Sequence, residues 1–300
     1  MSATLADVKE GLKAAAKRAF ESFPAGVQEE ITSRYAAVRA RRKYGREFQA
    51  CWDLVQRSQW LSPADLQALQ AERLRALVAH AYATVPFYRT SFDERGVRPE
   101  DIRTPEHLER LPLLTKQDVR HHGERLLSTA ESRLRGHLIG TSGTTGTPLQ
   151  FYWDHRREAM ETALVLRHLG WAGFRRGDPK AALRGLEVHP DGRGRVTYWR
   201  YNRAENELHF SSSHLGEATV AAYLARLRAF RPVVLWGYPS SIHVLAELLE
   251  RRGERAGLPL RGVFLSSEPV YDWQRELIES VFEARVFDWY GLSEGVVSAG

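Results

Sequence analysis

The chain has 300 residues, of which 43% are hydrophobic and 27% are charged, and its formal net charge is +6 at pH 7. This composition is typical of a globular protein that buries a large core, and it excludes the disordered and fibrous classes. The single cysteine, Cys51, excludes a disulfide framework and a cysteine-rich zinc site and favours a reducing compartment, so we expect a cytoplasmic protein.

The first 135 residues are predicted to form a mainly helical segment that packs on the main domain. Its first twenty residues carry lysines and lack the apolar centre of a signal peptide. No apolar run in the sequence approaches 18 residues, so we expect no transmembrane segment.

A basic stretch, "RYAAVRARRKYGR" (34–46), holds six basic residues and no acidic one. The plainer interpretation is a solvated helix face. The alternative is a membrane-associated adaptor, which predicts vesicle binding that falls steeply with salt. The basic excess of the chain suits anionic ligands, but it does not choose between a nucleotide, a nucleic acid and a lipid surface.

A capped helix is predicted to begin near Ser62, because Pro63 and Asp65 follow it. Apolar residues then recur at helical spacing until Pro86 ends the run. The stretch 100–120 is punctuated by Pro105 and Pro112 and is predicted to be connecting structure.

A loop rich in glycine and hydroxyl groups follows, within "GTSGTTGTPLQFYWD" (140–154). Its spacing excludes a Walker A loop, which needs a second glycine where Thr145 stands and then a lysine. It also excludes the dinucleotide fingerprint and the hydrolase nucleophile elbow. The flanking stretches are β-prone, which predicts a hairpin, and the bare backbone and hydroxyls favour wrapping of phosphate oxygens over a merely solvated turn.

Beyond the loop, residues 136–300 are predicted to form an α/β nucleotide-binding part. The stretches "VVLWG", "GVFLSS" and "ARVFDWYG" are predicted strands separated by helices, which gives βαβαβ and a largely parallel sheet. Ligands of such sheets bind beyond the carboxyl ends of the strands. These ends read "WGYPSS", "SSEP" and "DWYGLSE", so the sequence predicts a nucleotide site there.

Two of these motifs carry a family resemblance. "TSGTTGTP" (141–148) resembles the phosphate loop of the adenylate-forming acyl-CoA synthetase superfamily, and "YGLSE" (290–294) resembles its aromatic-Gly-x-Thr/Ser-Glu motif. "LPLLTKQDVR", "GYPSSIHVLAELL" and "SSEPV" resemble the phenylacetate-CoA ligase branch, particularly its relatives in capsular polysaccharide biosynthesis. The resemblance covers about residue 50 to the end, and it implies the fold of the large N-terminal domain of these enzymes.

The resemblance implies an enzyme that converts a small-molecule carboxylic acid and ATP to an acyl-adenylate and then transfers the acyl group to CoA or a carrier thiol. ATP, Mg²⁺ and CoA are the implied cofactors, and no nucleic-acid partner is implied; homodimerisation stays open. Glu294 is the implied Mg²⁺ ligand and, with Thr144, a catalytic residue. The implied phosphate-binding residues are Thr141, Ser142, Gly143, Thr145, Gly146 and Thr147.

By the same resemblance, Tyr290 stacks on adenine, Asp288 lies near its exocyclic amine, and Ser267, Glu268 and Pro269 line its other side, with Gly291 also at the nucleotide. Trp236, Gly237 and Tyr238 are implied to shape the acyl pocket. Three plainer alternatives stay open. Tyr290 and Trp289 are then core aromatics, Glu268 is a surface carboxylate beside a turn, and Glu294 is an acid at a helix N-terminus.

The sequence departs from the superfamily pattern in two ways. Leu149 stands where a lysine commonly follows the loop proline, a form typical of the phenylacetate-CoA ligase branch. The sequence also ends at Gly300, before the motif whose aspartate holds the ribose and before the small C-terminal domain with its catalytic lysine. We therefore expect a fragment of a longer ligase; the alternative is a non-catalytic nucleotide-binding or scaffold protein in polysaccharide biosynthesis.

Overall fold

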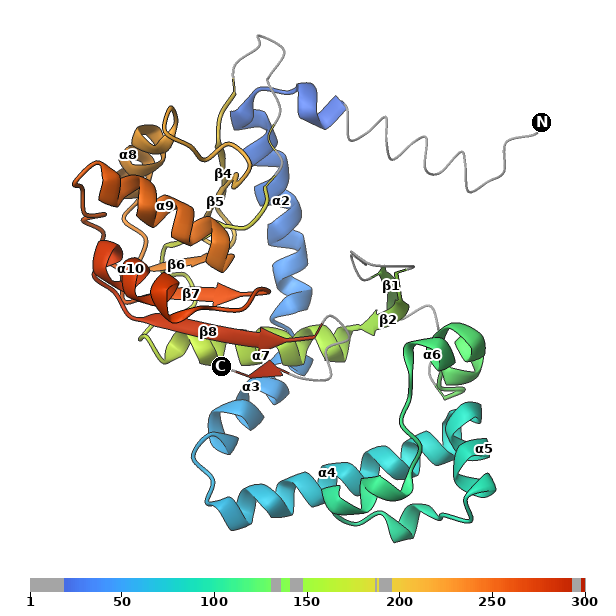
Figure 1. The fold of residues 1–300 in the computed structure, drawn as a ribbon. Coiled ribbons are helices and arrows are strands. Elements are labelled where there is room, and N and C mark those ends of the chain that lie inside the picture. The colour runs from blue at the N-terminus through green and yellow to red at the C-terminus, as the bar shows by residue number, and fades with distance from the viewer. Residues whose placement is uncertain are drawn as a thin grey trace. The chain divides into compact units, whose positions relative to one another are not determined.

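The structure is a computed structural model that describes residues 19–130, 136–140, 148–186, 188, 196–292 and 298–299 (Figure 1). The chain forms two compact units. One comprises Met1–Gly45 with Glu161–Gly300, and the other comprises Arg46–Met160. The domain boundary expected at residue 135 stays a prediction.

The unit of residues 46–160 is mainly helical, and the helical prediction for the first 135 residues is confirmed over 19–130. Its longest helix begins after Ser62, whose hydroxyl oxygen accepts a 3.2 Å hydrogen bond from the Asp65 amide, and ends at Thr84. A small core of Val78, Phe92 and Ile102 holds the helices together. The elements are α3 (Arg46–Ser58), α4 (Pro63–Thr84), α5 (Pro86–Glu94), η1 (Pro99–Asp101), η2 (Pro105–Arg110), α6 (Lys116–His122) and η3 (Gly123–Leu126).

The same unit holds the predicted hairpin, which is confirmed. Strand β1 (Gly136–Gly140) pairs antiparallel with β2 (Gln150–Asp154), with Gly140 opposite Gln150. The chain continues into helix α7 (His155–Gly170), which ends in the other unit.

The other unit is built on a seven-stranded sheet with the order β4-β5-β3-β6-β7-β8-β9. The five inner strands are parallel, and β4 and β9 are antiparallel to their neighbours, so the predicted parallel sheet is confirmed. The strands are β3 (Lys180–Leu183), β4 (Trp199–Asn202), β5 (Glu207–Phe210), β6 (Val234–Gly237), β7 (Gly262–Ser266), β8 (Val286–Gly291) and β9 (Ser298–Ala299).

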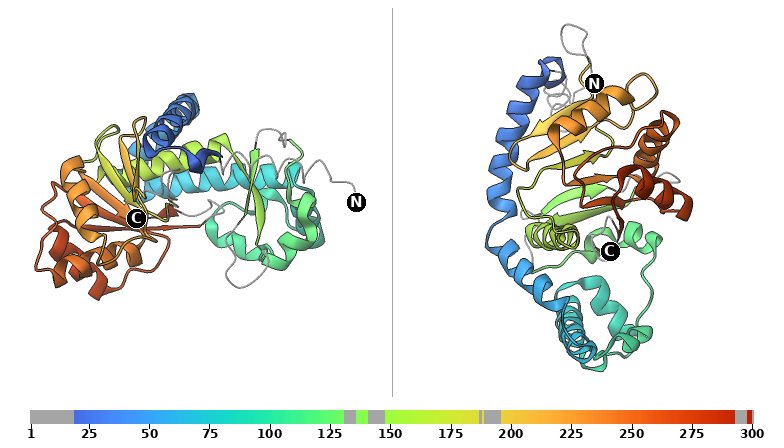
Figure 2. Two further views of the ribbon diagram at one scale, coloured as in Figure 1. Left: turned by 90° about the horizontal axis from the view of Figure 1, so that it is seen from above. Right: turned by 90° about the vertical axis from the view of Figure 1, so that its left-hand side faces the viewer.

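Helices cover both faces of this sheet (Figure 2). Helices α8 (Val220–Phe230), α9 (Pro239–Arg251) and α10 (Asp272–Phe282) bury one face in the main core, with strand residues such as Leu235 and Leu265. The end of α7 packs Leu169 on the other face against Val234 and Phe264. Side chains of a strand alternate between the two faces, and both faces are covered at the centre of the sheet, so β6 is apolar throughout and β7 is apolar up to its final Ser266.

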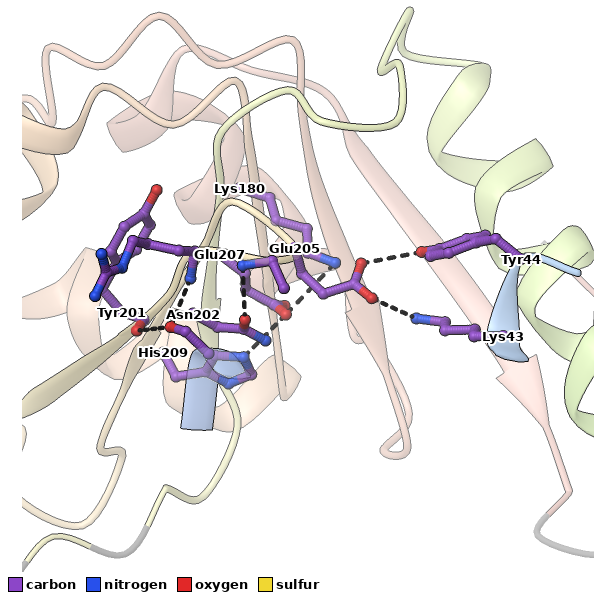
Figure 3. A network of polar contacts seen from close by, with 11 residues as sticks. Lys43, Tyr44, Lys180, Tyr201, Asn202, Glu205, Glu207 and His209 are labelled. Atoms are coloured by element: carbon purple, nitrogen blue, oxygen red, sulfur yellow. Dashed lines mark hydrogen bonds and ion pairs between the residues drawn. The ribbon is translucent and has the colours of Figure 1, made fainter. Parts of the chain in front are cut away.

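Helix α2 (Ala25–Lys43) lies along the edge strand β4 and is tied to it by polar side chains. Glu29 accepts a 3.0 Å hydrogen bond from the Tyr201 amide, and the Ser33 hydroxyl accepts one of 3.0 Å from the Arg203 amide. At the end of the helix, Glu205 accepts hydrogen bonds from Lys43 (3.3 Å) and from the Tyr44 hydroxyl (3.0 Å) (Figure 3).

A largely buried carboxylate lies behind this contact, at the amino ends of the parallel strands. Glu207 on β5 accepts a 2.9 Å contact from His209 and lies 3.5 Å from the ammonium of Lys180 on β3 (Figure 3). Burial alone would raise the pKa of Glu207, but the His209 hydrogen bond and the Lys180 charge lower it to about 2. Glu207 is therefore ionised at neutral pH, and its contacts join β3 to β5.

Candidate functional site at the carboxyl edge of the sheet

The carboxyl ends of the parallel strands meet at one edge, because the strands are in register. Leu183 of β3 is opposite Gly237 of β6, Gly237 is opposite Leu265 of β7, and Leu265 is opposite Asp288 of β8. Tyr238, Ser267, Glu268 and Tyr290, which the sequence selects as site residues, lie in or just beyond this row on β6, β7 and β8. The structure thus brings the three strand ends together, as predicted.

The strands β3 and β6 are parallel neighbours, but the connections that leave them run toward opposite edges of the sheet. From β3 the chain continues to β4 and β5, toward one edge of the sheet, whereas from β6 it continues to β7, toward the other edge. Such a switch point leaves a crevice outside the strand ends, where open α/β sheets bind their ligands. The best-placed groups are therefore those that directly follow β3 and β6.

Arg184 directly follows β3 at this switch point. Its guanidinium carbon lies 5.2 Å from the ring centroid of Trp236 and 5.7 Å from that of Tyr238. No carboxylate within the described residues pairs with it, so its charge is directed to solvent and to the two aromatic rings. Sequence reasoning missed Arg184, because it predicted no strand at residues 180–183 and so gave no reason to single out the basic residue before Gly185.

A glycine is required on each side of the switch point, for a different reason in each case. Gly185 has φ +65°, and its amide donates a 3.1 Å hydrogen bond to the Ser212 hydroxyl. A Cβ at Gly237 would lie 2.7 Å from the Ile242 side chain and 2.8 Å from the Leu183 carbonyl oxygen. Gly237 is therefore needed where β6 passes between β3 and α9, which places Tyr238 beside Arg184.

Ser267 follows β7 in a left-handed conformation, with φ +75°. A residue other than glycine rarely adopts this conformation, and such strain gathers at functional sites. The preceding Ser266 is buried, and its hydroxyl accepts a 3.2 Å hydrogen bond from the indole nitrogen of Trp236. The end of β7 therefore fixes the Trp236 ring and turns the backbone at Ser267, two residues before Pro269.

Glu268 is exposed and engaged in a local contact. Its two carboxylate oxygens accept 3.0 Å hydrogen bonds from the amide and the hydroxyl of Ser240, in the first turn of α9. This geometry matches the plainer alternative of a surface carboxylate beside a turn. Its implied place at the nucleotide stays a prediction.

On β8 the side chains alternate between the two faces of the sheet. Phe287 and Trp289 turn toward α7, where their rings lie 6.1 Å and 5.2 Å from that of His168. Asp288 and Tyr290 therefore turn to the opposite face, and both are exposed, Tyr290 at 60%. Tyr290 is thus not a core aromatic, whereas Trp289 is half-buried. Gly291 is exposed beside Tyr290, and both pair with β9.

His168 is buried in an aromatic cage under this edge. Only 1% of it is exposed, and rings of Trp171, Phe264, Phe287 and Trp289 surround it. Within the described residues, neither of its ring nitrogens has a hydrogen-bond partner. Burial, and then the charge of Arg167, lower the pKa of His168 to about 4. The imidazole is therefore neutral at pH 7 and supports the strand that bears Tyr290.

The predicted phosphate loop and the predicted metal ligand lie outside the described residues. Their roles therefore stay predictions. These residues are Thr141, Ser142, Gly143, Thr144, Thr145, Gly146, Thr147 and Glu294. In the ranges that the structure does describe, no group of three or more His, Cys, Asp or Glu side chains is placed to hold a metal ion. No helix of the described ranges has the length and apolarity that crossing a membrane requires.

Comparison with known proteins supports the resemblance read from the motifs. The chain is 31% identical over 237 residues to the phenylacetate-coenzyme A ligase of Thermus thermophilus, an alignment that covers 76% of this chain and 50% of that protein. It is 26% identical over 232 residues to protein CapK of Staphylococcus aureus, covering 77% and 51% respectively. This chain is a relative of the phenylacetate-coenzyme A ligases. The predicted resemblance is confirmed, and the chain spans about half the length of the curated relatives it matches.

The fold is confirmed by a solved ligase. The structure of 2-hydroxyisobutyryl-CoA ligase in complex with 2-HIB-AMP and CoA, in the thioesterification state, matches with a TM-score of 0.59 and 23% identity. The match covers 78% of this chain and 50% of that one. No protein-family model matches the chain. This relative of the phenylacetate-coenzyme A ligases therefore shares the α/β fold of the matched part of 2-hydroxyisobutyryl-CoA ligase.

Proposed function

We propose that this chain carries the nucleotide- and acid-binding part of an adenylate-forming acid–thiol ligase. Its reaction joins a small carboxylic acid to the α-phosphate of ATP and then passes the acyl group to CoA or a carrier thiol. The observation that carries the proposal is the row of strand ends at the switch point, in a relative of the phenylacetate-coenzyme A ligases. There Arg184 follows β3, strained Ser267 follows β7, and exposed Tyr290 lies near the end of β8.

The proposed chemistry has two displacements. A carboxylate oxygen attacks the α-phosphorus, the bond to pyrophosphate breaks, and an acyl-adenylate forms. A thiolate then attacks the acyl carbon, and AMP leaves with the bonding electron pair. The first step brings two anions together, so the chain must supply positive charge and hydrogen-bond donors.

The residues of the edge suit these tasks. Tyr290 presents an exposed ring for stacking on adenine, and Asp288 on the same face presents a carboxylate for its exocyclic amine. Arg184 would attract the acid or the phosphates, since no described carboxylate neutralises it. The loop 141–147 would hold phosphate oxygens. Mg²⁺ on Glu294 would screen the charges of the phosphates.

The first test is calorimetric titration with ATP and Mg²⁺. Gly143→Val and Gly146→Val should weaken ATP binding at least tenfold without lowering the Tm, because a β-branched side chain blocks close backbone approach to phosphate. Gly216→Val is the matched control, since nothing lies within 4 Å of a Cβ at that half-buried position. Equal affinity in all four proteins overturns the phosphate assignment.

The second test separates the metal and the reaction. Glu294→Gln should remove most of the Mg²⁺ dependence of ATP affinity, because the amide lacks the carboxylate charge. Acid-dependent exchange of labelled pyrophosphate into ATP is then measured on the chain together with its downstream reading frame. Exchange supports the ligase. ATP binding with no exchange for any acid of a broad panel supports the scaffold alternative instead.

A further inference from the structure

Helix α2 turns its large apolar side chains to solvent. All four of its large apolar side chains are exposed, and they are Val27 (43%), Ile31 (42%), Tyr35 (65%) and Val38 (67%). Their spacing of four, four and three residues places them on one face of the helix. The buried side chains are polar, Gln28 and Ser33, and Ser33 is bonded to the edge of the sheet. The helix thus turns an apolar ridge outward.

Arginines flank this ridge, which we define as Val27, Ile31, Tyr35 and Val38. Arg39 lies over the Tyr35 ring, with its guanidinium carbon 5.9 Å from the ring centroid. Arg41, Tyr44 and Arg176 line a hollow of about 390 Å³ whose remaining wall is formed by Ala37, Ala40 and Ala204. Arg176 stacks on Tyr44 at 3.6 Å. Within the described residues, neither Arg41 nor Arg176 pairs with an acid.

The acidic side chains near the ridge already have hydrogen-bond or ion-pair partners within the chain. Glu30 pairs with Arg34 and Arg203, and Glu29 accepts a hydrogen bond from the β4 backbone. Glu205 is bonded to Lys43 and Tyr44 (Figure 3). The outer face of α2 is therefore apolar along its centre and net positive along its flanks and its C-terminal end.

We propose that the outer face of α2 docks on a membrane surface of anionic phospholipid. The ridge inserts Val, Ile and Tyr side chains at the level of the headgroups, and the hollow between Arg41 and Arg176 receives a lipid phosphate. A polyanion without an apolar part, such as a nucleic acid, leaves the ridge without a contact. A second copy of the same face brings arginine against arginine, which like-charge repulsion disfavours.

The test is cosedimentation of the chain with vesicles. Vesicles of phosphatidylcholine with 30% phosphatidylglycerol are compared with vesicles of pure phosphatidylcholine, each between 50 and 400 mM NaCl. We expect binding to the anionic vesicles at least tenfold tighter than to the neutral ones, with most of it lost at high salt. Equal binding to both compositions, or no binding to either, overturns the proposal.

Variants separate the two parts of the face. Arg41→Gln and Arg176→Gln should each weaken binding to the anionic vesicles about fivefold. Tyr35→Ser with Val38→Ser should weaken it about tenfold and leave the Tm unchanged, because both side chains are exposed. Leu113→Ser and Arg95→Gln, exposed positions of the other unit, are the matched controls.

Two outcomes contradict the lipid assignment. If the ridge variants bind vesicles like the parent but shift the sedimentation coefficient from dimer to monomer, the ridge is a self-association surface. If the control variants lose as much vesicle binding as the α2 variants, the attraction is a property of net charge alone. A parent-like Tm in each variant makes either result decisive.

Discussion

Glu268, two residues after β7, accepts hydrogen bonds from both the amide and the hydroxyl of Ser240, in the first turn of α9. The carboxylate thereby serves as the cap of a helix whose own N-cap residue, Tyr238, contributes no side-chain bond. The contact joins the end of one strand to the helix that leaves the neighbouring strand. Two candidate-site segments are thus held by one side chain.

This relationship gives a prediction that separates capping from nucleotide binding. Glu268→Ala and Ser240→Ala should each lower the free energy of unfolding by about 1 kcal/mol, as loss of a helix cap does. Urea unfolding measures the change, and ATP titration is run in parallel. If Glu268 only caps, both variants change ATP affinity equally; if it also contacts the nucleotide, only Glu268→Ala weakens ATP binding.

Gly237 is predicted to tolerate no side chain. Gly237→Ala places a methyl group 2.8 Å from the Leu183 carbonyl oxygen, and a backbone atom cannot move aside cheaply. We expect a loss of about 3 kcal/mol in the free energy of unfolding, as in overpacked cores. Gly216→Ala, where a Cβ meets nothing within 4 Å, should change it by less than about 0.5 kcal/mol. Equal Tm values for the two variants contradict the packing at the switch point.

The left-handed conformation of Ser267 is predicted to lower the stability of the fold and to hold the backbone in the conformation that binds ATP. Ser267→Gly should raise the free energy of unfolding by about 1 kcal/mol, because glycine adopts φ +75° without strain. The same change should weaken ATP binding two- to fivefold, since the turn is then less rigid. Glu283→Gly at φ +51°, after α10, is the control that relieves similar strain and leaves ATP affinity unchanged. Unchanged affinity in both variants makes the Ser267 strain incidental.

His168 is predicted to make stability depend on pH between about 4 and 6.5. The folded chain keeps the imidazole neutral down to its pKa of about 4, whereas the unfolded chain protonates it near pH 6.5. The unfolded state therefore binds more protons in this window, so stability falls as the pH falls. The contribution is complete above pH 6.5, and about 3 kcal/mol is lost by pH 4.

The check is urea unfolding at several pH values with His168→Phe. The variant should lack this part of the pH dependence, because phenylalanine fits an aromatic cage and has no nitrogen to protonate. His121→Phe, at an exposed position of α6, should keep the parent profile. Parallel profiles for the parent and His168→Phe would show that the cage admits a proton freely.

Local patterns made much of the fold predictable. The hairpin β1–β2 and the β6–β7–β8 order were readable because apolar runs, prolines and glycines mark the ends of neighbouring elements along the chain. The sequence also placed Asp288 and Tyr290 correctly at a strand end. Their shared face follows from the two-residue period of a strand once Trp289 is known to pack on α7.

Long-range contacts were not predictable. Arg184 acquires its aromatic neighbours only because β6 pairs with β3, about fifty residues away in sequence, as the register shows. The bond between Glu268 and Ser240 likewise depends on the pairing of β6 with β7. The apolar outer face of α2 was hidden because its basic residues alone suggested a solvated helix, and burial of Gln28 and Ser33 depends on β4.

The hydrogen bonds from Tyr201 and Arg203 to α2 have one more consequence. These two amides belong to the outermost strand on that side of the sheet and its continuation, and they point away from β5. An unpaired strand rim is a template on which foreign strands add. Glu29 and Ser33 accept hydrogen bonds from these two amides, so α2 occupies the place where a further strand would pair. The helix therefore ends the sheet on this side and blocks the addition of a foreign strand.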